Sequence, residues 1–86
     1  MENYKVLIKP SAVKELQKIS DPDFSRLTEK ISHLSSHPRP KDCEKLSRQE
    51  KYRIRQGSYR VIYLIVDAAK EVIIYKIGHR RNGYKK

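Results

Sequence analysis

The C-terminal third of the chain carries runs of strand-forming residues, and these runs most constrain the possible fold. Val, Ile and Tyr dominate residues 59–66 and again residues 72–77, with turn residues before, between and after them. This composition is typical of strands that pack together in a small sheet. We therefore expect neighbouring strands over both runs.

The pair Gly57-Ser58 separates the first of these runs from another strand-like run, residues 51–56. Because Gly accepts the positive φ of a tight turn, the pair predicts a two-residue hairpin loop. In that hairpin Arg55 faces Arg60, and the alternation of side chains along a strand puts Arg53 on the same face. The sequence thus predicts three arginines on one face of the sheet.

Such an arrangement has two interpretations. Like charges that face each other on adjacent strands are destabilising, so the arginines either spread into water or are held in place for an anion. The guanidinium group carries a rigid fork of donors that matches phosphate oxygens, which favours the anion. A solvated charged face explains the hairpin equally well, and the hairpin alone leaves both interpretations open.

The length of 86 residues suits one domain with a thin core, so we expect a single domain over residues 1–86. The single cysteine, Cys43, excludes a disulfide framework and suits a reducing compartment. No apolar run approaches the length of a membrane span, and the first ten residues lack the apolar segment of a leader peptide. We expect a soluble, cytoplasmic protein without a membrane partner.

The net charge of +10 is distributed unevenly along the chain. Residues 1–38 carry six Lys or Arg against five Asp or Glu, whereas residues 39–86 carry fourteen against five. A basic half on a small protein indicates a polyanionic partner, most often a nucleic acid. An acidic protein or a membrane surface would also attract this charge, but no basic amphipathic helix carries it.

The N-terminal part alternates in polarity over residues 4–8, which predicts a short strand closed by Pro10. Ser11 is a candidate N-cap for a helix that follows. The apolar residues of that helix are spaced for one buried stripe, namely Val13, Leu16 and Ile19.

A second helix is predicted from Asp21-Pro22, read as an N-cap followed by proline at the first helical position. Pro38 and Pro40 prevent its continuation. Its apolar residues recur at helical spacing, namely Phe24, Leu27, Ile31 and Leu34. We assign these residues to the core and not to a site.

The segment of residues 37–49 is irregular and basic, and we expect Leu46 to cover the edge of the core, from a short strand or a loop. The predicted fold is α+β, with the order β-α-α-β-β-β. A helical hairpin packs on one face of a small, mainly antiparallel, twisted sheet, which leaves the other face open. The basic residues would lie on that open face.

The tail after the last predicted strand combines His79 with Arg80, Arg81 and Tyr84. The ordinary pKa of histidine, about 6.5, allows proton exchange near neutrality. The arginines could neutralise phosphate oxygens, and the tyrosine could stack on a base or lend its hydroxyl. The alternative is a frayed basic tail, as is common at the end of a domain.

Other candidate sites are weaker. Cys43 has no histidine nearby in the sequence and no strand-to-helix turn around it, so we do not expect a thiol nucleophile. His33 and His37 lie at the end of the second predicted helix, and their protonated forms would favour its C-terminus. The scattered His and Cys show no ligand spacing, so we expect no metal and no cofactor.

Two segments, KLSRQEKYRIRQGSYRVIY and IGHRRNGYK, carry a resemblance to a known family. They are similar to the RelE/ParE superfamily of bacterial toxins, and most similar to its RelE-like branch, whose members share YRIR-x-G-x-YR-x-IY and a closing G-H-R-x-x-x-Y. The resemblance covers nearly the whole chain. It implies a RelE-like fold, an endoribonuclease that cuts mRNA in the ribosomal A site, and a cognate antitoxin such as a RelB-like protein.

The resemblance also implies site residues. The implied catalytic residues are Arg60, Arg80, His79, Tyr84 and Arg55, and the implied RNA-binding residues are Arg53, Arg55, Lys51, Arg81 and Lys85. In the family, the 2′-hydroxyl of the RNA attacks the adjacent phosphate.

This sequence departs from RelE where Arg53 and Arg55 replace lysines. Because arginine stays protonated, these two would stabilise charge and not carry protons. His79 would then perform one proton transfer, and Tyr84 or its ordered surroundings would assist the other. Glu44, near the position of a general base in some related toxins, is a further candidate.

Two other functions remain compatible with the sequence. A ParE-like inhibitor of DNA gyrase would share the fold without hydrolysing anything. A basic nucleic-acid-binding module without activity would bind RNA with a steep salt dependence and cause no growth arrest.

Overall fold

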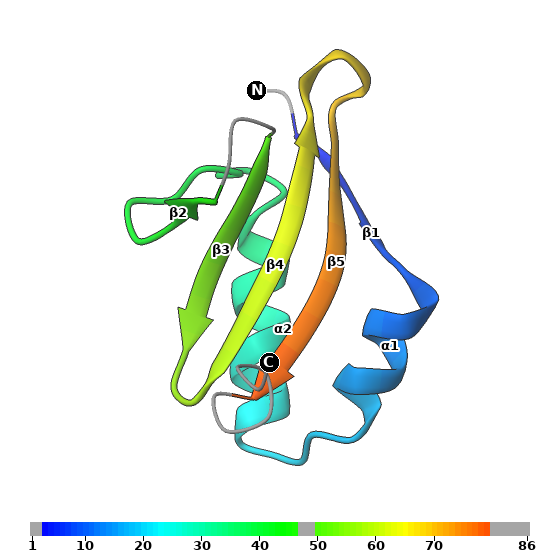
Figure 1. Ribbon diagram of the computed structural model, residues 1–86, viewed down its shortest axis with the longest axis vertical. Coiled ribbons are helices and arrows are strands. Elements are labelled where there is room, and N and C mark those ends of the chain that lie inside the picture. Colours follow the sequence, from blue (N-terminus) through cyan, green and yellow to red (C-terminus); the bar gives the residue numbers. More distant parts are fainter. Residues whose placement is uncertain (1–2, 47–49, 80–86) are drawn as a thin grey trace.

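The computed structural model describes residues 3–46 and 50–79, which form two helices and a five-stranded sheet. Figure 1 shows the sheet in front of α2, with α1 beside the second half of β5. The elements in chain order are β1 (Lys5–Ile8), α1 (Pro10–Gln17), α2 (Asp23–His33), β2 (Glu44–Lys45), β3 (Lys51–Gln56), β4 (Tyr59–Val66), the short 3₁₀ helix η1 (Asp67–Ala69) and β5 (Glu71–His79).

The strands lie in the order β1-β5-β4-β3-β2. β1 pairs in parallel with β5, and the other three pairings are antiparallel. The predicted class is therefore confirmed: a helical pair packs on a mainly antiparallel sheet. The short strand β2 is added at one edge, and β5 runs to His79, two residues beyond its predicted end.

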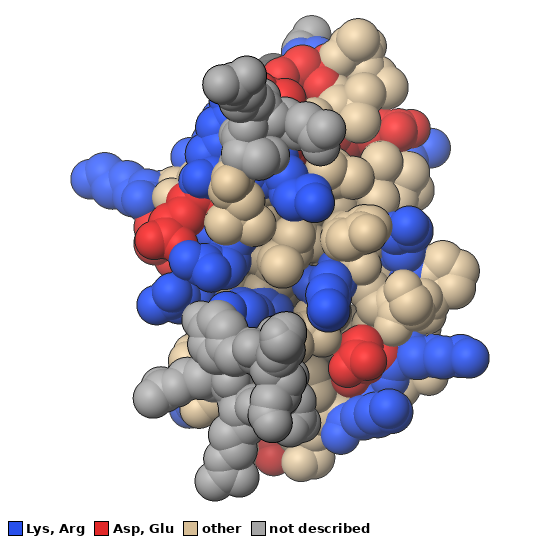
Figure 2. Space-filling model, in the orientation of Figure 1, with Lys and Arg blue, Asp and Glu red and all other residues tan. Residues whose placement is uncertain are grey.

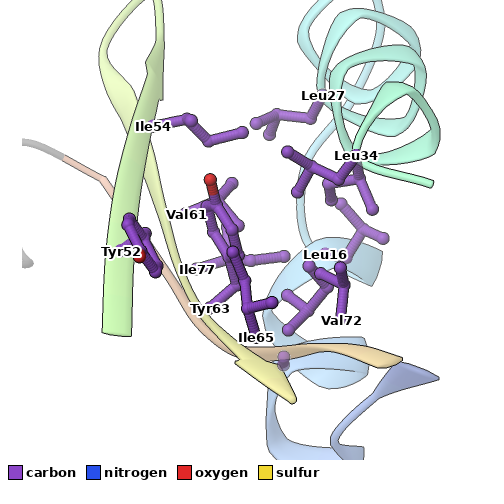
Figure 3. Packing of buried hydrophobic residues seen from close by; sticks show 13 residues of the cluster. Leu16, Leu27, Leu34, Tyr52, Ile54, Val61, Tyr63, Ile65, Val72 and Ile77 are labelled. Atoms are coloured by element: carbon purple, nitrogen blue, oxygen red, sulfur yellow. The ribbon is translucent and has the colours of Figure 1, made fainter. Parts of the chain in front are cut away.

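The core lies between the sheet and the helices (Figure 3). The buried hydrophobic residues of β3 and β4 alternate along each strand, as expected for strands with one covered face, and Arg60 is an additional buried residue next to Val61. The buried hydrophobic residues are Ala12, Leu16, Leu27, Ile31, Leu34, Tyr52, Ile54, Val61, Tyr63, Ile65, Val72, Ile74 and Ile77. The face of the sheet away from this core is the open face.

The start of α1 differs from its prediction. The helix begins at Pro10, with Lys9 as the N-cap, so Ser11 is not the cap. Proline suits this place because its φ is already helical and the first N–H groups of a helix have no intrahelical partner. The residues buried from α1 are Ala12 and Leu16, while Val13 is only half-buried.

The start of α2 also differs from its prediction, because Pro22 is the N-cap and not the first helical residue, and Asp21 is therefore not the cap. The Oδ1 atom of Asp21 accepts hydrogen bonds from the backbone N–H of Ser25 at 3.1 Å and from its hydroxyl at 2.7 Å. The helix itself begins at Asp23. Phe24 is 36% exposed, so its assignment to the core is wrong. Leu27, whose burial was also predicted, is fully buried.

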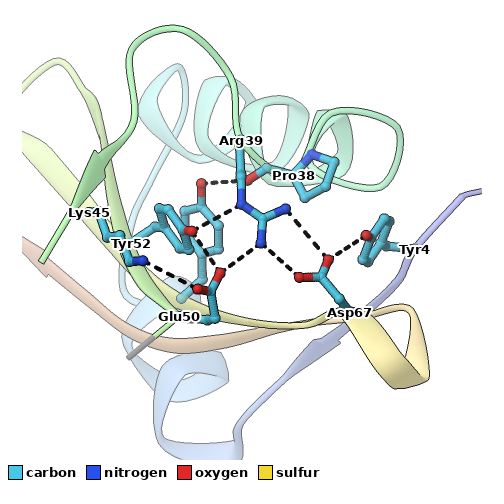
Figure 4. A network of polar contacts seen from close by, with 8 residues as sticks. Tyr4, Pro38, Arg39, Lys45, Glu50, Tyr52 and Asp67 are labelled. Carbon is cyan, nitrogen blue, oxygen red and sulfur yellow. Dashed lines mark hydrogen bonds and ion pairs between the residues drawn. The ribbon is translucent and has the colours of Figure 1, made fainter. Parts of the chain in front are cut away.

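Arg39 ties the segment after α2 to the sheet (Figure 4). Its Nε donates to the hydroxyl of Tyr52 at 2.9 Å, and its Nη2 donates to Glu50 at 2.7 Å and to Asp67 at 2.9 Å. The hydroxyl of Tyr4 donates to the same aspartate at 2.6 Å. The network therefore connects the segment between α2 and β2 to three places in the sheet, namely the start of β3, the end of β4 and the start of β1.

Leu46 does not cover the core as predicted, because it follows the edge strand β2 and is 39% exposed. Among the described residues, no helix is long and apolar enough to cross a membrane.

Candidate functional site

The β3–β4 hairpin places two arginines directly opposite each other. Its loop is Gly57-Ser58, with Gly57 at φ +61°, and Arg55 pairs with Arg60 as predicted. On the other side of β4, Arg60 pairs with Gly78 of β5. Its partner Gly78 places no side chain beside Arg60, yet Arg60 is only 8% exposed and is buried.

The next row across the sheet contains one more arginine. Glu44 pairs with Arg53, Arg53 with Ile62, and Ile62 with Lys76. Directly paired residues point to the same side of a sheet, so these side chains share the open face. Arg53 and Glu44 form an ion pair, in which the arginine side chain is 20% and the glutamate side chain 57% exposed.

The Glu44 carboxyl reveals how the arginines are arranged. A hydrogen bond from Arg53 is the largest cause of its lowered pKa, and the charges of Arg53, Arg55 and Arg60 lower that pKa further. The three arginines thus share one region of the open face but differ in burial, since Arg60 is 8% exposed whereas Arg55 is exposed. We call Arg53, Arg55 and Arg60 the arginine cluster.

The open face continues beyond the cluster as an apolar strip with a basic border. Figure 2 shows this face, with Lys and Arg around uncharged residues. A third row of paired residues consists of Lys51, Leu64, Ile73 and Leu7. Lys51, an implied RNA-binding residue, therefore lies on the same face as the arginine cluster.

His79 lies on the other face. It pairs with Tyr59, and the two rings meet edge-on with centroids 4.8 Å apart at 84°. Tyr59 packs against the core, so the alternation of β4 directs this pair toward the helices and Arg60 away from them. The structure brings the three arginines together but does not bring His79 to their face.

The other residues implied by the resemblance, Arg80, Arg81, Tyr84 and Lys85, lie outside the described residues. Within residues 3–46 and 50–79, no three His, Cys, Asp or Glu side chains gather as a metal site would require.

Sequence reasoning missed two features of the site. It did not foresee the pairing of Glu44 with Arg53, since a two-residue strand carries too little pattern to be recognised. It also missed the open-face cation Lys76, because β5 contains an irregularity opposite Ile62 and Tyr63 that shifts the alternation.

Comparisons with known proteins agree with this architecture. The family described as the ParE toxin of the type II toxin–antitoxin system parDE matches residues 6–84. RelE1 of Methanocaldococcus jannaschii is 30% identical to this chain, over 95% of this chain and 96% of its own length.

Solved toxin–antitoxin complexes contain similar structures. The RelBE2 complex of Mycobacterium tuberculosis contains a chain that is 27% identical, with a TM-score of 0.79, over 91% of this chain and 99% of that one. The RelE–RelB complex of Pyrococcus horikoshii contains one that is 30% identical, with a TM-score of 0.79, over 90% and 94%. The isolated Escherichia coli RelE toxin, at 22% identity and a TM-score of 0.79, shares the fold over 88% of this chain and 83% of its own.

The family match spans nearly the whole chain, and the sheet, its two helices and the basic open face form a RelE-like structure. This protein belongs to the RelE/ParE superfamily, as a toxin of a type II toxin–antitoxin system.

Proposed function

We propose that this toxin is a metal-independent endoribonuclease that cuts mRNA in the ribosomal A site and so inhibits translation. The observation that carries the proposal is the arginine cluster, which places three permanent positive charges on paired positions of the open face, one of them in an ion pair with Glu44. A phosphodiester offers the same pattern of anionic oxygens, and arginine binds such oxygens with two parallel hydrogen bonds.

The proposed reaction begins when the 2′-oxygen of a ribose attacks the adjacent phosphorus. The new P–O2′ bond forms while the P–O5′ bond breaks, which leaves a 2′,3′-cyclic phosphate and a 5′-hydroxyl. Arg55 and Arg60 would stabilise the negative charge of the pentacoordinate intermediate, and Arg53 would bind the RNA. The Nε–H of Arg53 is buried without an acceptor among the described residues, so a phosphate oxygen could satisfy it.

Two protons must also move, one from the 2′-hydroxyl and one to the departing 5′-oxygen. Glu44 is a poor base for this step because Arg53 lowers its pKa. His79 could act only if the end of β5 released it from Tyr59. We propose that solvent water accepts the proton of the 2′-hydroxyl and that Tyr84 donates a proton to the 5′-oxygen. Arg80 adds positive charge, and Arg81, Lys85 and Lys51 hold the flanking RNA.

We further propose a cognate antitoxin as the protein partner. The similar chains of Mycobacterium tuberculosis and Pyrococcus horikoshii were solved as complexes with antitoxins. The contact of Glu44 with Arg53 illustrates how a carboxylate can occupy the cluster. An acidic side chain of an antitoxin would inhibit the toxin by binding there in place of RNA.

A second candidate function is inhibition of DNA gyrase, because the matching family is described as the ParE toxin. Inducible expression separates the two functions. The ribonuclease predicts a halt in protein synthesis with new transcript 5′ ends, whereas the gyrase inhibitor predicts DNA damage with intact transcripts. RNA binding without growth arrest would instead indicate a non-catalytic module. Co-expression of the antitoxin should abolish either kind of toxicity.

A further inference from the structure

A pocket of about 300 Å³ lies between α1 and β5, and neither the arginine cluster nor the proposed mechanism uses it. Its lining combines an aromatic ring, two ammonium groups, a hydroxyl and a carboxylate. The lining residues are Lys9, Ser11, Ala12, Glu15, Tyr75 and Lys76. This size lies at the lower end of pockets that hold small ligands or parts of larger ones.

The irregularity in β5 places Tyr75 at this pocket. Ile62 pairs with Lys76 and Tyr63 with Ile74, so Tyr75 is the extra residue without a partner on β4. Such an extra residue re-aims its side chain, and Tyr75 is 40% exposed. Nothing in the hydrophobic core requires an aromatic ring at this position, because Ile74 and Ile77 already fill the buried places on either side.

Cations from two distant elements lie over the exposed ring. The Nζ atom of Lys9, between β1 and α1, is 4.7 Å from the centroid of the Tyr75 ring, and that of Lys51, at the start of β3, is 5.3 Å away. Lysine side chains are flexible, so an incoming planar group could take their place on the ring while the ammonium groups bind its phosphates.

The pocket also lies within reach of a strand of RNA bound at the arginine cluster. Lys76 belongs to the same row as Arg53, with Ile62 between them. Neighbouring strands are about 4.8 Å apart, so the backbone positions of Arg53 and Lys76 are separated by roughly 10 Å across β4. RNA that is held by Arg53 could therefore reach Lys76 at the pocket.

We propose that this pocket receives one nucleobase of the RNA next to the cleaved phosphodiester, with Tyr75 as its stacking platform. The inference rests on the proposed ribonuclease function and deepens it, because it identifies residues that select the base. Glu15 accepts a hydrogen bond from an exocyclic amine, as carboxylates do from cytosine. The pocket thus favours a base with an amino group over uracil. Lys9 and Lys76 bind the flanking phosphates.

The test maps transcript 5′ ends after expression of the wild type and of four variants. The variants are Tyr75→Ala, Tyr75→Phe, Glu15→Gln and Phe24→Ala. Phe24 is the matched control, an aromatic residue of similar exposure on α2. The wild type should cut with a base preference at one position beside the cleaved bond. Because stacking of a base contributes about 1–3 kcal/mol, Tyr75→Ala should cut about 5- to 150-fold more slowly and without this preference.

The other variants complete the pattern. Tyr75→Phe, which retains the ring, should recover the preference that Tyr75→Ala loses. Glu15→Gln should change which base is preferred, and Phe24→Ala should match the wild type. Cleavage by Tyr75→Ala and Glu15→Gln at the wild-type rate and with the wild-type preference would overturn the pocket alone. If Tyr75→Ala cuts normally but is no longer inhibited by the co-expressed antitoxin, the pocket would bind the antitoxin and not RNA. Absence of any cleavage by the wild type would overturn the proposed function itself.

Discussion

Arg60 and His79 lie on opposite faces of the sheet, although they occupy neighbouring positions at the ends of paired strands. Arg60 pairs with Gly78, and His79 pairs with Tyr59 one residue further along. A shift of one residue reverses the face of a strand side chain. The arginine cluster and the histidine are therefore separated by the sheet itself, and the two groups should respond differently to substitution.

We predict that Arg60→Ala slows mRNA cleavage about 10²- to 10³-fold, the usual effect of removing a group that stabilises transition-state charge. His79→Ala should lower the cleavage rate less than about tenfold, well below the 10²- to 10⁴-fold loss that is typical when a general acid or base is removed. Cleavage rates on ribosomes with a defined A-site codon provide the measurement. A loss for His79→Ala as large as that for Arg60→Ala would show that the end of β5 opens during the reaction.

Glu44→Gln removes the carboxylate that now occupies the arginine cluster. Because Arg53 would then be free for RNA, we expect tighter RNA binding and cleavage at least as fast as in the wild type. Titration of short RNAs at several salt concentrations gives the affinity and its salt dependence. Asp42→Asn is the matched control, since Asp42 pairs with Lys30 instead. A fall in cleavage of 100-fold or more would mean that Glu44 serves as the base.

The Arg39 network should make stability dependent on pH. Hydrogen bonds from Arg39, then Tyr52 and Lys45, lower the pKa of Glu50 from about 4.5 to about 2. Between these pH values the unfolded chain binds more protons than the folded one, so the free energy of unfolding rises with pH. The stability that Glu50 contributes is lost as the pH falls toward 2. The Arg39 guanidinium likewise lowers the pKa of Asp67.

Denaturant unfolding at pH values from 2 to 7 measures this dependence. Glu50→Gln should flatten the curve between pH 2 and 4.5, whereas Glu29→Gln, on the exposed side of α2, should leave it unchanged. The same slope in Glu50→Gln and the wild type would contradict the assignment.

The contrast between two neighbours in α2 tests the core. Leu27 is fully buried, whereas Phe24 is 36% exposed. Leu27→Ala should lower the free energy of unfolding by about 2–5 kcal/mol through lost burial and a remaining cavity. Phe24→Ala should cost much less. Chemical denaturation of both variants gives the comparison, and equal losses would indicate that Phe24 is buried against another part of the chain.

The fold was largely predictable because its strongest signals are local. Glycine at position 57 and the alternation of residues 51–66 determine the hairpin and its register, and helical spacing identified Leu27 and Ile31. These patterns depend only on neighbours in the chain. The wrong prediction for the start of α1 is also local. Ser11 is acceptable as an N-cap and Pro10 as a first helical residue, and the helix begins at Pro10.

The site was less predictable because it depends on pairings between distant segments. The three arginines could be placed on one face from the hairpin alone. In contrast, the contact of Glu44 with Arg53 required the short strand β2, and the turn of His79 toward Tyr59 required the register of β5. A two-residue strand and a one-residue shift leave almost no pattern in the sequence.

The central claim is that the arginine cluster holds the phosphodiester that is cut. Its most direct test compares Arg53→Ala/Arg55→Ala/Arg60→Ala with Lys14→Ala/Lys18→Ala/Arg26→Ala, which removes the same charge from exposed helical and inter-helix positions. The measurement is the yield of transcript fragments with a 2′,3′-cyclic phosphate and a 5′-hydroxyl from translating ribosomes. We predict that only the cluster variant loses cleavage while both variants remain folded. Equal cleavage by the two variants would contradict the account.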